Sequence, residues 1–401
     1  MKVLAVTSEL PWPLDSGGHL RTFHLLKHVA AHVDLRLVVP VHAGQEPTVA
    51  VLNQWNIRVV PVVVAPRTKF AESKRLLNAQ LHREPYVMYR RHARPEMFAA
   101  WETEIRREKP DVAHLDHLDS FLFHEIAAKL GVPTVLDLHN VYSLILSRMA
   151  DEQTNLLKKV FFRGEARRLA YIETRACRSV NAVLAVSSTE ADHYRKLGAK
   201  AVHVAPNGVD CAAFQDLKTG RSVTPPVVMY LGTMSWGPNV TAAVYLAEEV
   251  FPKVRAKFPD AKLLLVGKDP CPEVRATARI AGVEVTGSVP SVRPYLEQAS
   301  LLAVTLDSGG GTRLKILEAF AAGLPVVSTA VGAEGIDAKP GEEIIIAERP
   351  DMAAAICDLV ADPARGQRLA EQACRLAQQT YDWPMIGEKV VAVIRGLAKK
   401  S

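Results

Sequence analysis

Short apolar segments alternate with longer segments of helical periodicity over most of the 401 residues. The apolar segments are continuous runs of Val, Leu and Ile, which is typical of strands buried on both faces of a parallel sheet. The first half of the chain contains seven such runs: KVLAVTS, DLRLVVPV, RVVPVVVA, DVAHLD, PTVLDLH, AVLAVS and AVHVAPN. The second half contains six: VVMYLG, KLLLVG, GVEVTG, LLAVTL, LPVVST and EEIIIA.

This strand-helix alternation predicts right-handed βαβ crossovers and a doubly wound α/β fold. The pattern occurs twice, and the polar, proline-containing stretch DLKTGRSVTPP at 216–226 separates the two series. A chain of this length is also too long for one ordinary core. We therefore expect two Rossmann-like domains, 1–215 and 227–383, facing one another across a cleft. Ligands of such sheets bind at the carboxyl ends of the strands, which we expect to line the cleft.

The composition is that of a globular protein, with 48% hydrophobic and 23% charged residues. A net charge of +6 favours anionic ligands or an anionic surface. It is far short of the charge density of a nucleic-acid-binding protein, so we expect no nucleic-acid partner.

The cysteines are scattered, odd in number and without a C-x-x-C pair, so neither a disulfide framework nor a zinc site is expected. They are Cys177, Cys211, Cys271, Cys357 and Cys374. The N-terminal MKVLAVTSELPWP reads as a first buried strand rather than a signal peptide, and no run approaches the ~20 apolar residues of a membrane-spanning helix. A cytoplasmic protein that is not integral to a membrane is expected.

The segment DSGGGTRLKILEAFAAGLPVVST, 307–329, follows one apolar run and opens a helix. Its glycines let the backbone approach a ligand, and the first N–H groups of the helix point there unpaired. With the helix dipole these groups form an anion site, most often for phosphate, to which Arg313 and Lys315 add charge. Glu318 lies about one and a half turns into the helix, where a carboxylate suits a pair of sugar hydroxyls. The alternative is an ordinary turn with solvated charges.

A second glycine pair, Gly17 and Gly18, lies between the first strand and the first helix. It lacks the G-x-G-x-x-G spacing, which argues against a nicotinamide enzyme, and a loop kept flexible for packing is the alternative. His139 ends the strand PTVLDLH and is expected at the cleft mouth, able to hydrogen-bond a sugar hydroxyl or a phosphate. His114 and His117, at the preceding strand, are interpreted as structural.

Two cation-rich stretches, 67–95 and 157–178, mix Lys and Arg with Phe, Tyr and Leu. Helices that lie on anionic lipid have this composition. A solvated helix face is the alternative interpretation for each.

Several motifs in a fixed order resemble the family 4 glycosyltransferases, retaining enzymes with the GT-B fold. The motifs are GVEVTGSVPSVRPYLEQASLLAVTL followed by GGGTRLKILEAFAAGLPVVSTAVGAEGI, the segment AVLAVSSTEADHYRKLGAKAVHVAPNGVDCAAF, VVMYLGTMSWGPNVTAA, the N-terminal Gly-Gly pair and the tail YDWPMIGEKVVAVI. The likeness covers nearly the whole chain. It implies a first domain that contacts the acceptor and is completed by a C-terminal helix at 384–401, and a second domain that binds a nucleotide sugar.

The resemblance also assigns roles. Glu318 matches the second glutamate of the family's E-x7-E motif, which holds the nucleotide ribose. The backbone before it, at Gly311, Thr312, Arg313 and Leu314, corresponds to the phosphate site. Gly17 and Gly18 match a loop that closes over donor and acceptor, and His139 matches a histidine that contacts the transferred sugar. Gly232 and Thr233 follow the first strand of the donor domain.

The sequence departs from the family in two features. Gly310 stands where the first glutamate is expected, and Thr233 and Asn239 stand where the family has an arginine and a lysine that neutralise the pyrophosphate. A diphosphate leaving group needs compensating positive charge. We hypothesise that Arg313 and Lys315, aided by Lys268, take over that role.

These features predict a retaining transfer of a sugar from a nucleotide diphosphate sugar to a glycan or lipid-linked acceptor, without a cofactor. The absence of a D-x-D triplet agrees with a reaction that needs no metal. A nucleotide-sugar epimerase on the same fold and a non-catalytic sugar-nucleotide-binding partner are the alternatives. Peripheral contact with an anionic membrane is the remaining expectation.

Overall fold

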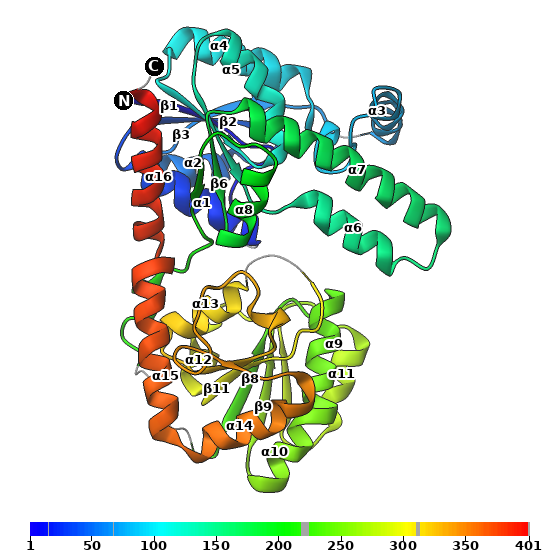
Figure 1. Cartoon of the computed structure of the whole chain (residues 1–401), viewed down its shortest axis with the longest axis vertical. Coiled ribbons are helices and arrows are strands. Elements are labelled where there is room, and N and C mark those ends of the chain that lie inside the picture. Colours follow the sequence, from blue (N-terminus) through cyan, green and yellow to red (C-terminus); the bar gives the residue numbers. More distant parts are fainter. Residues whose placement is uncertain (15, 67, 218–223, 310–312, 400–401) are drawn as a thin grey trace. The chain divides into compact units, whose positions relative to one another are not determined.

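The computed structural model describes residues 1–14, 16–66, 68–217, 224–309 and 313–399 (Figure 1). Contacts divide the chain into two compact units, Met1–Pro206 with Ile386–Ser401, and Asn207–Met385. The first segment of the first unit thus ends at Pro206, whereas its end was expected at residue 215. Of the expected linker, 218–223 lie outside the described residues.

The first unit is a seven-stranded sheet in the order β3-β2-β1-β4-β5-β6-β7, and every strand pair is parallel. Its strands are β1 (Lys2–Val6), β2 (Asp34–Val41), β3 (Arg58–Val63), β4 (Val112–Asp116), β5 (Thr134–Leu138), β6 (Ala182–Ala185) and β7 (Val202–Val204). Its helices are α1 (Gly17–Ala30), α2 (Glu46–Gln54), α3 (Lys69–Leu81), α4 (Pro95–Glu108), α5 (His124–Lys129), α6 (Tyr142–Glu152), α7 (Leu156–Ser179) and α8 (Ser188–Lys196).

The second unit is a six-stranded parallel sheet in the order β10-β9-β8-β11-β12-β13. Its strands are β8 (Val227–Leu231), β9 (Lys262–Val266), β10 (Val283–Gly287), β11 (Leu301–Val304), β12 (Val326–Ser328) and β13 (Ile345–Ile346). Its helices are α9 (Gly237–Tyr245), α10 (Phe251–Lys257), α11 (Pro272–Ala276), α12 (Arg293–Gln298), α13 (Leu314–Ala321), α14 (Met352–Ala361) and α15 (Pro363–Leu376). The two all-parallel sheets confirm the predicted fold class.

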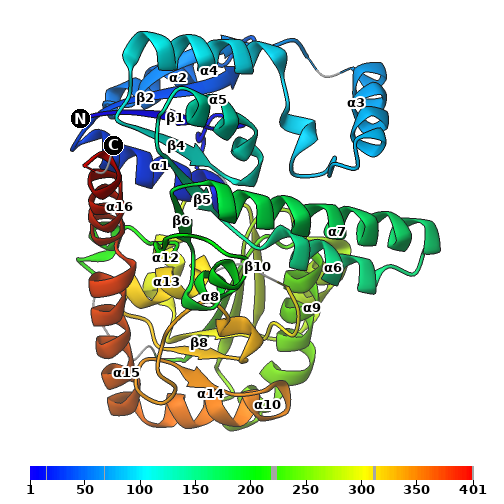
Figure 2. The same ribbon diagram turned by 45° about the horizontal axis from the view of Figure 1, so that its top comes forward.

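Helices cover both faces of each sheet, which is why the strands read as continuous apolar runs (Figure 2). All five residues of β5, for example, are buried. In each sheet the strand order reverses beside its first strand, at β1 and β4 and at β8 and β11. Ligands of doubly wound sheets bind outside the carboxyl ends of the strands at such a reversal.

The last helix, α16 (Trp383–Ala398), contributes to the first unit from Ile386 onward. There Gly387 lies so close to His28 of α1 that a Cβ at position 387 would be 2.3 Å from the imidazole Cγ. A glycine is therefore what allows α16 to pack here. In the described part of the chain, no helix combines the length and apolarity needed to cross a bilayer.

Candidate functional site

A buried polar network lies at the carboxyl ends of β4 and β5 in the first unit. His139 directly follows β5, and its Nε2 is 3.1 Å from Oδ1 of Asp116, the last residue of β4. The second carboxylate oxygen of Asp116 accepts a hydrogen bond from the Thr22 hydroxyl of α1 at 2.9 Å. Asp137, inside β5, places its Oδ2 3.6 Å from the same imidazole nitrogen. The imidazole of His139 is thus held between two carboxylates.

Arg21 of α1 neutralises the second of these carboxylates. Its Nη2 donates to Asp137 Oδ1 at 2.6 Å and its Nε to Oδ2 at 3.0 Å, a bidentate pair in which both side chains are buried. Its Nη1 donates to the carbonyls of Ala205 and Pro206 at 2.8 and 3.0 Å. Arg21 therefore connects the network to Ala205 and Pro206, the last two residues of the segment Met1–Pro206.

The network holds His139 as a cation. Burial alone would lower its pKa, but Asp116 and Asp137 outweigh burial and raise the pKa to about 9. Burial would raise the pKa of Asp137, yet Arg21 and His139 hold it well below its usual value. His139 therefore presents an imidazolium at neutral pH, suited to an anion or an electron-rich oxygen.

Gly17 and Gly18 are exposed and form the first turn of α1, which corrects the sequence analysis that placed them in a loop before it. The helix begins this early because the Ser16 side chain accepts a hydrogen bond from the backbone N–H of His19. A Cβ on Gly18 would lie 4.0 Å from Nδ1 of His139. The structure thus brings Gly18 and His139 together at the positive end of α1.

His114 and His117 differ in their surroundings. His114 lies within β4 and is buried, which lowers its pKa. His117 follows β4 with a φ of 74°, uncommon for a residue other than glycine, and its Nε2 is 2.6 Å from the Tyr142 hydroxyl. Burial and the neighbouring His139 lower its pKa to about 3, so it is neutral. Its ring meets that of His139 edge-on, with 4.4 Å between centroids.

His114, Asp116 and Asp137 also place one possible metal-ligand atom each within 4.8 Å of one another. Both carboxylates, however, already accept hydrogen bonds from cations, Arg21 and His139. A divalent ion would have to displace these partners. The donor set therefore fits an internal ion-pair network better than a metal centre.

A second polar network lies at the carboxyl end of β8 in the second unit. The ammonium of Lys315, in the first turn of α13, donates to Asn239 Oδ1 of α9 at 2.9 Å and to the Tyr230 hydroxyl at 3.2 Å. It also lies 4.4 Å from the centroid of the Tyr230 ring. The Tyr230 hydroxyl donates to Asn239 Oδ1 at 2.8 Å, and Asn239 Nδ2 donates to the Thr233 carbonyl at 3.0 Å.

Glycines make room for this arrangement. A Cβ on Gly232, the residue after β8, would lie 2.7 Å from Asn239 Nδ2 and 2.9 Å from Lys315 Nζ. Gly267, with a φ of +155°, lies against Gly232, and a Cβ there would be 1.7 Å from the Gly232 carbonyl oxygen. Only glycine fits at position 267, and a side chain at position 232 would displace the ammonium of Lys315.

The start of α13 carries the other predicted donor-site residues. Arg313 is the N-cap and is buried, with Nη2 3.4 Å from the Val331 carbonyl oxygen. Leu314 begins the helix, and the partly buried Glu318 lies one turn after Lys315. The predicted phosphate-binding residues Gly310, Gly311 and Thr312 lie outside the described residues.

Burial shifts both ionisable groups of this helix face toward neutrality. Burial, together with the charge of Arg313, lowers the pKa of Lys315 to about 7. It also raises the pKa of Glu318 to about 7, against the influence of Lys315. An arriving diphosphate would favour the charged ammonium.

Two neighbouring residues complete this end of the sheet. Lys268 is exposed after β9, and its carbonyl oxygen accepts the backbone N–H of Met234 at 2.8 Å, which ties together the loops after β8 and β9. Trp236, 44% exposed, lies beside Gly309: a Cβ built on Gly309 would lie 2.8 Å from its Cη2.

Sequence reasoning did not identify Asp116, Asp137 or Arg21. A signal was present, because each aspartate ends or interrupts an apolar run expected to be buried on both faces. A buried carboxylate requires a partner. Tyr230 and Trp236 carried no comparable signal.

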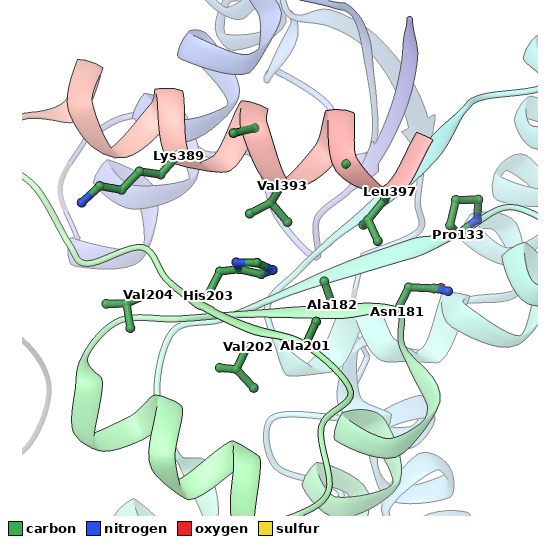
Figure 3. Close-up of a pocket in the computed structure, with 12 residues that line it drawn as sticks. Pro133, Asn181, Ala182, Ala201, Val202, His203, Val204, Lys389, Val393 and Leu397 are labelled. Atoms are coloured by element: carbon green, nitrogen blue, oxygen red, sulfur yellow. The ribbon is translucent and has the colours of Figure 1, made fainter. Parts of the chain in front are cut away.

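A groove of about 720 Å³ lies elsewhere in the first unit, where α16 runs beside β6 and β7 (Figure 3). Pro133, Asn181 and Ala201, which line it, each precede a strand. The groove therefore extends from the amino ends of β5 and β6 along the edge strand β7, whereas His139 and Asp116 lie at the carboxyl ends of β5 and β4. It is separate from the candidate site.

Comparison with known proteins agrees with this geometry. Residues 225–362 match the family model "Glycosyl transferases group 1", and residues 19–213 match "Glycosyltransferase Family 4". The chain is 30% identical over 208 residues to the phosphatidyl-myo-inositol mannosyltransferase of Mycolicibacterium smegmatis, a match covering 49% of this chain and 52% of the relative. The chain thus spans about half the length of the curated relatives it matches.

Solved structures show the same fold. Sucrose-phosphate synthase from Thermosynechococcus elongatus superimposes with a TM-score of 0.67 and 16% identity, covering 100% of both chains. HepE from Anabaena in complex with UDP gives a TM-score of 0.70 and 17% identity, covering 99% of this chain and 100% of HepE. The two all-parallel sheets and these structural neighbours identify the GT-B fold. With both family models matched, the chain belongs to the family 4 glycosyltransferases of the group 1 type.

Proposed function

We propose that the protein is a retaining glycosyltransferase that moves a sugar from a nucleotide diphosphate sugar to a hydroxyl of a glycan or lipid-linked acceptor. The product would serve polysaccharide or glycoconjugate synthesis. The observation that carries the proposal is the Lys315 ammonium, held at Asn239 where α13 begins. It places a cation beside a helix N-terminus at the carboxyl end of a parallel sheet, where an anionic ligand is expected.

In this proposal Arg313 and Lys315, with Lys268 nearby in the fold, stabilise the diphosphate as its bond to the sugar breaks. The backbone of residues 310–314 binds the phosphates, and Gly232 and Thr233 adjoin them. Glu318 holds the ribose.

The first unit contributes its own groups. Gly17 and Gly18 close over the donor, and the imidazolium of His139 contacts the transferred sugar. The departing phosphate takes the proton of the acceptor hydroxyl on the same face of the sugar, so the reaction needs neither a protein nucleophile nor a metal. The protein's contribution is to position the reactants and to stabilise charge.

The comparisons support the substrate classes proposed. The mycobacterial relative is named as a mannosyltransferase of phosphatidyl-myo-inositol, which favours a lipid-linked acceptor. HepE was solved with UDP and with UDP-glucose, which favours a nucleotide sugar donor. We propose a cytoplasmic enzyme in peripheral contact with an anionic membrane.

Thermal-shift measurements with UDP, GDP, ADP and their sugars test donor binding, since a ligand bound only by the folded state raises the midpoint. We expect one nucleotide series to raise it. Product analysis then compares donor alone with donor plus an acceptor panel, and NMR of the anomeric centre tests retention. Conversion of donor alone into an isomeric nucleotide sugar would indicate an epimerase. Donor binding without turnover on any acceptor would indicate a non-catalytic partner.

A further inference from the structure

The outer face of α7 carries cations without exposed carboxylates from the same helix. Both of its glutamates, Glu165 and Glu173, are buried. Glu165 accepts the backbone N–H groups of Tyr86 and Val87 at 2.8 Å each, and Glu173 accepts the backbone N–H of Ser143 at 3.1 Å. The exposed cations of the helix are Lys158, Arg163, Arg167, Arg175 and Arg178. Asp151 of α6 lies 3.0 Å from Arg163.

The first turns of α7 also expose large apolar side chains. Leu156 is 72% exposed, Leu157 82% and Val160 62%. They lie at the tip of the hairpin that α6 and α7 form, which projects from the first unit in both views (Figures 1 and 2). Single exposed apolar residues are common, but three within five positions mark an interaction surface.

Helix α3 has an exposed apolar stripe as well. Phe70, Leu77 and Leu81 are 82%, 62% and 73% exposed, and the exposed Lys74 lies between them on the same helical face. A helix of a globular domain normally turns such a stripe inward. Here the stripe has solvent against it.

Tyr86 joins these two elements. Its hydroxyl donates to Glu72 of α3, and its backbone N–H donates to Glu165 of α7. Both views show α3 and the α6–α7 hairpin projecting from the same side of the first unit (Figures 1 and 2). We define the basic-apolar surface as the large apolar and the cationic side chains exposed on α3 and on the first half of α7: Phe70, Lys74, Leu77, Leu81, Leu156, Leu157, Lys158, Val160, Arg163 and Arg167.

We propose that the basic-apolar surface docks the protein on a bilayer containing anionic lipid. Its apolar side chains enter the headgroup boundary, and its cations meet lipid phosphates. A second copy of the chain is a poorer occupant, because two surfaces with the same positive charge repel each other. This inference builds on the proposed lipid-linked acceptor, since docking would bring the first unit to a substrate held in the membrane.

The test is flotation of the full chain with vesicles of phosphatidylcholine alone or mixed with phosphatidylglycerol, at low and high salt. We expect binding to the mixed vesicles, weakened by salt. Leu156→Ser/Leu157→Ser/Val160→Ser and Phe70→Ser/Leu77→Ser/Leu81→Ser should each weaken partitioning roughly tenfold or more. Lys158→Gln/Arg167→Gln should weaken it about tenfold. The matched control Lys253→Gln/Lys257→Gln removes two exposed charges from α10 of the other unit and should leave partitioning unchanged.

Two results would overturn the proposal. The first is that the protein binds both vesicle types equally, or binds neither. The second is that the surface variants float with vesicles as the parent does but have a lower molar mass by light scattering. The second would identify a self-association surface. Thermal shifts with UDP and GDP on the same variants keep the tests apart. A surface variant that no longer floats but keeps its thermal shift with UDP or GDP supports docking. If the parent chain shows no thermal shift, only the proposed donor binding is contradicted, and the docking proposal is not.

Discussion

The ammonium of Lys315 and the carboxamide of Asn239 lie 2.9 Å apart, one on α13 and the other on α9. Position 239 is where the resemblance to the family leads us to expect a lysine. The structure thus places a cation at this point by a different route, from a neighbouring helix. The cation that the sequence lacks on α9 is thus supplied by α13, and we propose that it neutralises the donor phosphates.

Arg313→Ala/Lys315→Ala should lower kcat by at least about 100-fold, because the leaving diphosphate loses its compensating charge. Circular dichroism and the thermal midpoint should show a retained fold. Turnover at the parent rate would contradict the proposed role of both residues.

The position of the charge can be tested by moving it. Lys315→Met should weaken UDP or GDP binding and turnover, and Asn239→Lys in the same chain should restore part of both, since its ammonium would return to the same space. Thr241→Lys, on the exposed side of α9, is the matched control and should not rescue. Equal recovery with both lysines would mean that general charge, and not this site, matters.

Diphosphate affinity should fall as the pH rises above about 7. Burial lowers the pKa of Lys315 to about 7, so the free protein loses this proton there, while the bound anion requires it. Calorimetry with UDP and GDP from pH 6.5 to 8.5 should show roughly tenfold weakening and proton uptake on binding. Lys315→Arg should flatten the profile, because a guanidinium keeps its charge. An unchanged affinity for wild type over this range would refute the role of the ammonium.

Gly232→Ala should weaken diphosphate binding about tenfold, because its methyl group would lie 2.9 Å from Lys315 Nζ and displace it. Gly237→Ala is the matched control, since a Cβ there meets no atom within 4 Å. Calorimetry and the thermal midpoint compare the two variants. Equal affinity in both would show that the packing around Lys315 does not govern binding.

The His139 network should be most stabilising in mildly acid solution. The folded pKa of His139 is about 9, above its ordinary value, so its stabilisation is complete below pH ~6.5 and is lost as the pH rises through 9. Asp137 has a lowered pKa, so its contribution is present above pH ~4 and is lost on acidification.

NMR titration of the imidazole measures this pKa directly. The thermal midpoint of wild type should fall more between pH 6 and 9.5 than that of His139→Gln, with the exposed His203→Gln as control. An imidazole that titrates near 6.5 would show that the two aspartates do not hold the proton.

Much of the fold could be predicted from local patterns. Runs such as VVMYLG and KLLLVG identify strands because a doubly covered parallel sheet tolerates few polar positions. The exact start of α1 was not predictable in this way, since it depends on the Ser16 cap rather than on the apolar period.

The site was only partly accessible to sequence reasoning. His139 and Lys315 stood out because they lie next to a strand end and a glycine run. The partners that define their chemistry are distant in sequence: Arg21 and Asp137 are 116 positions apart, and Lys315 and Asn239 are 76 apart. Such pairings follow from the strand order and the helix packing, which no local pattern contains.

The contribution of residues 386–401 to the first unit has a consequence for biosynthesis. Domains fold largely as units as they leave the ribosome. The second unit is continuous in sequence and can form before the chain is released. The first unit, although its first 206 residues are made earlier, waits for its closing helix until residues 386–401 have been synthesised, and during that interval the α1 surface around His28 lacks its cover.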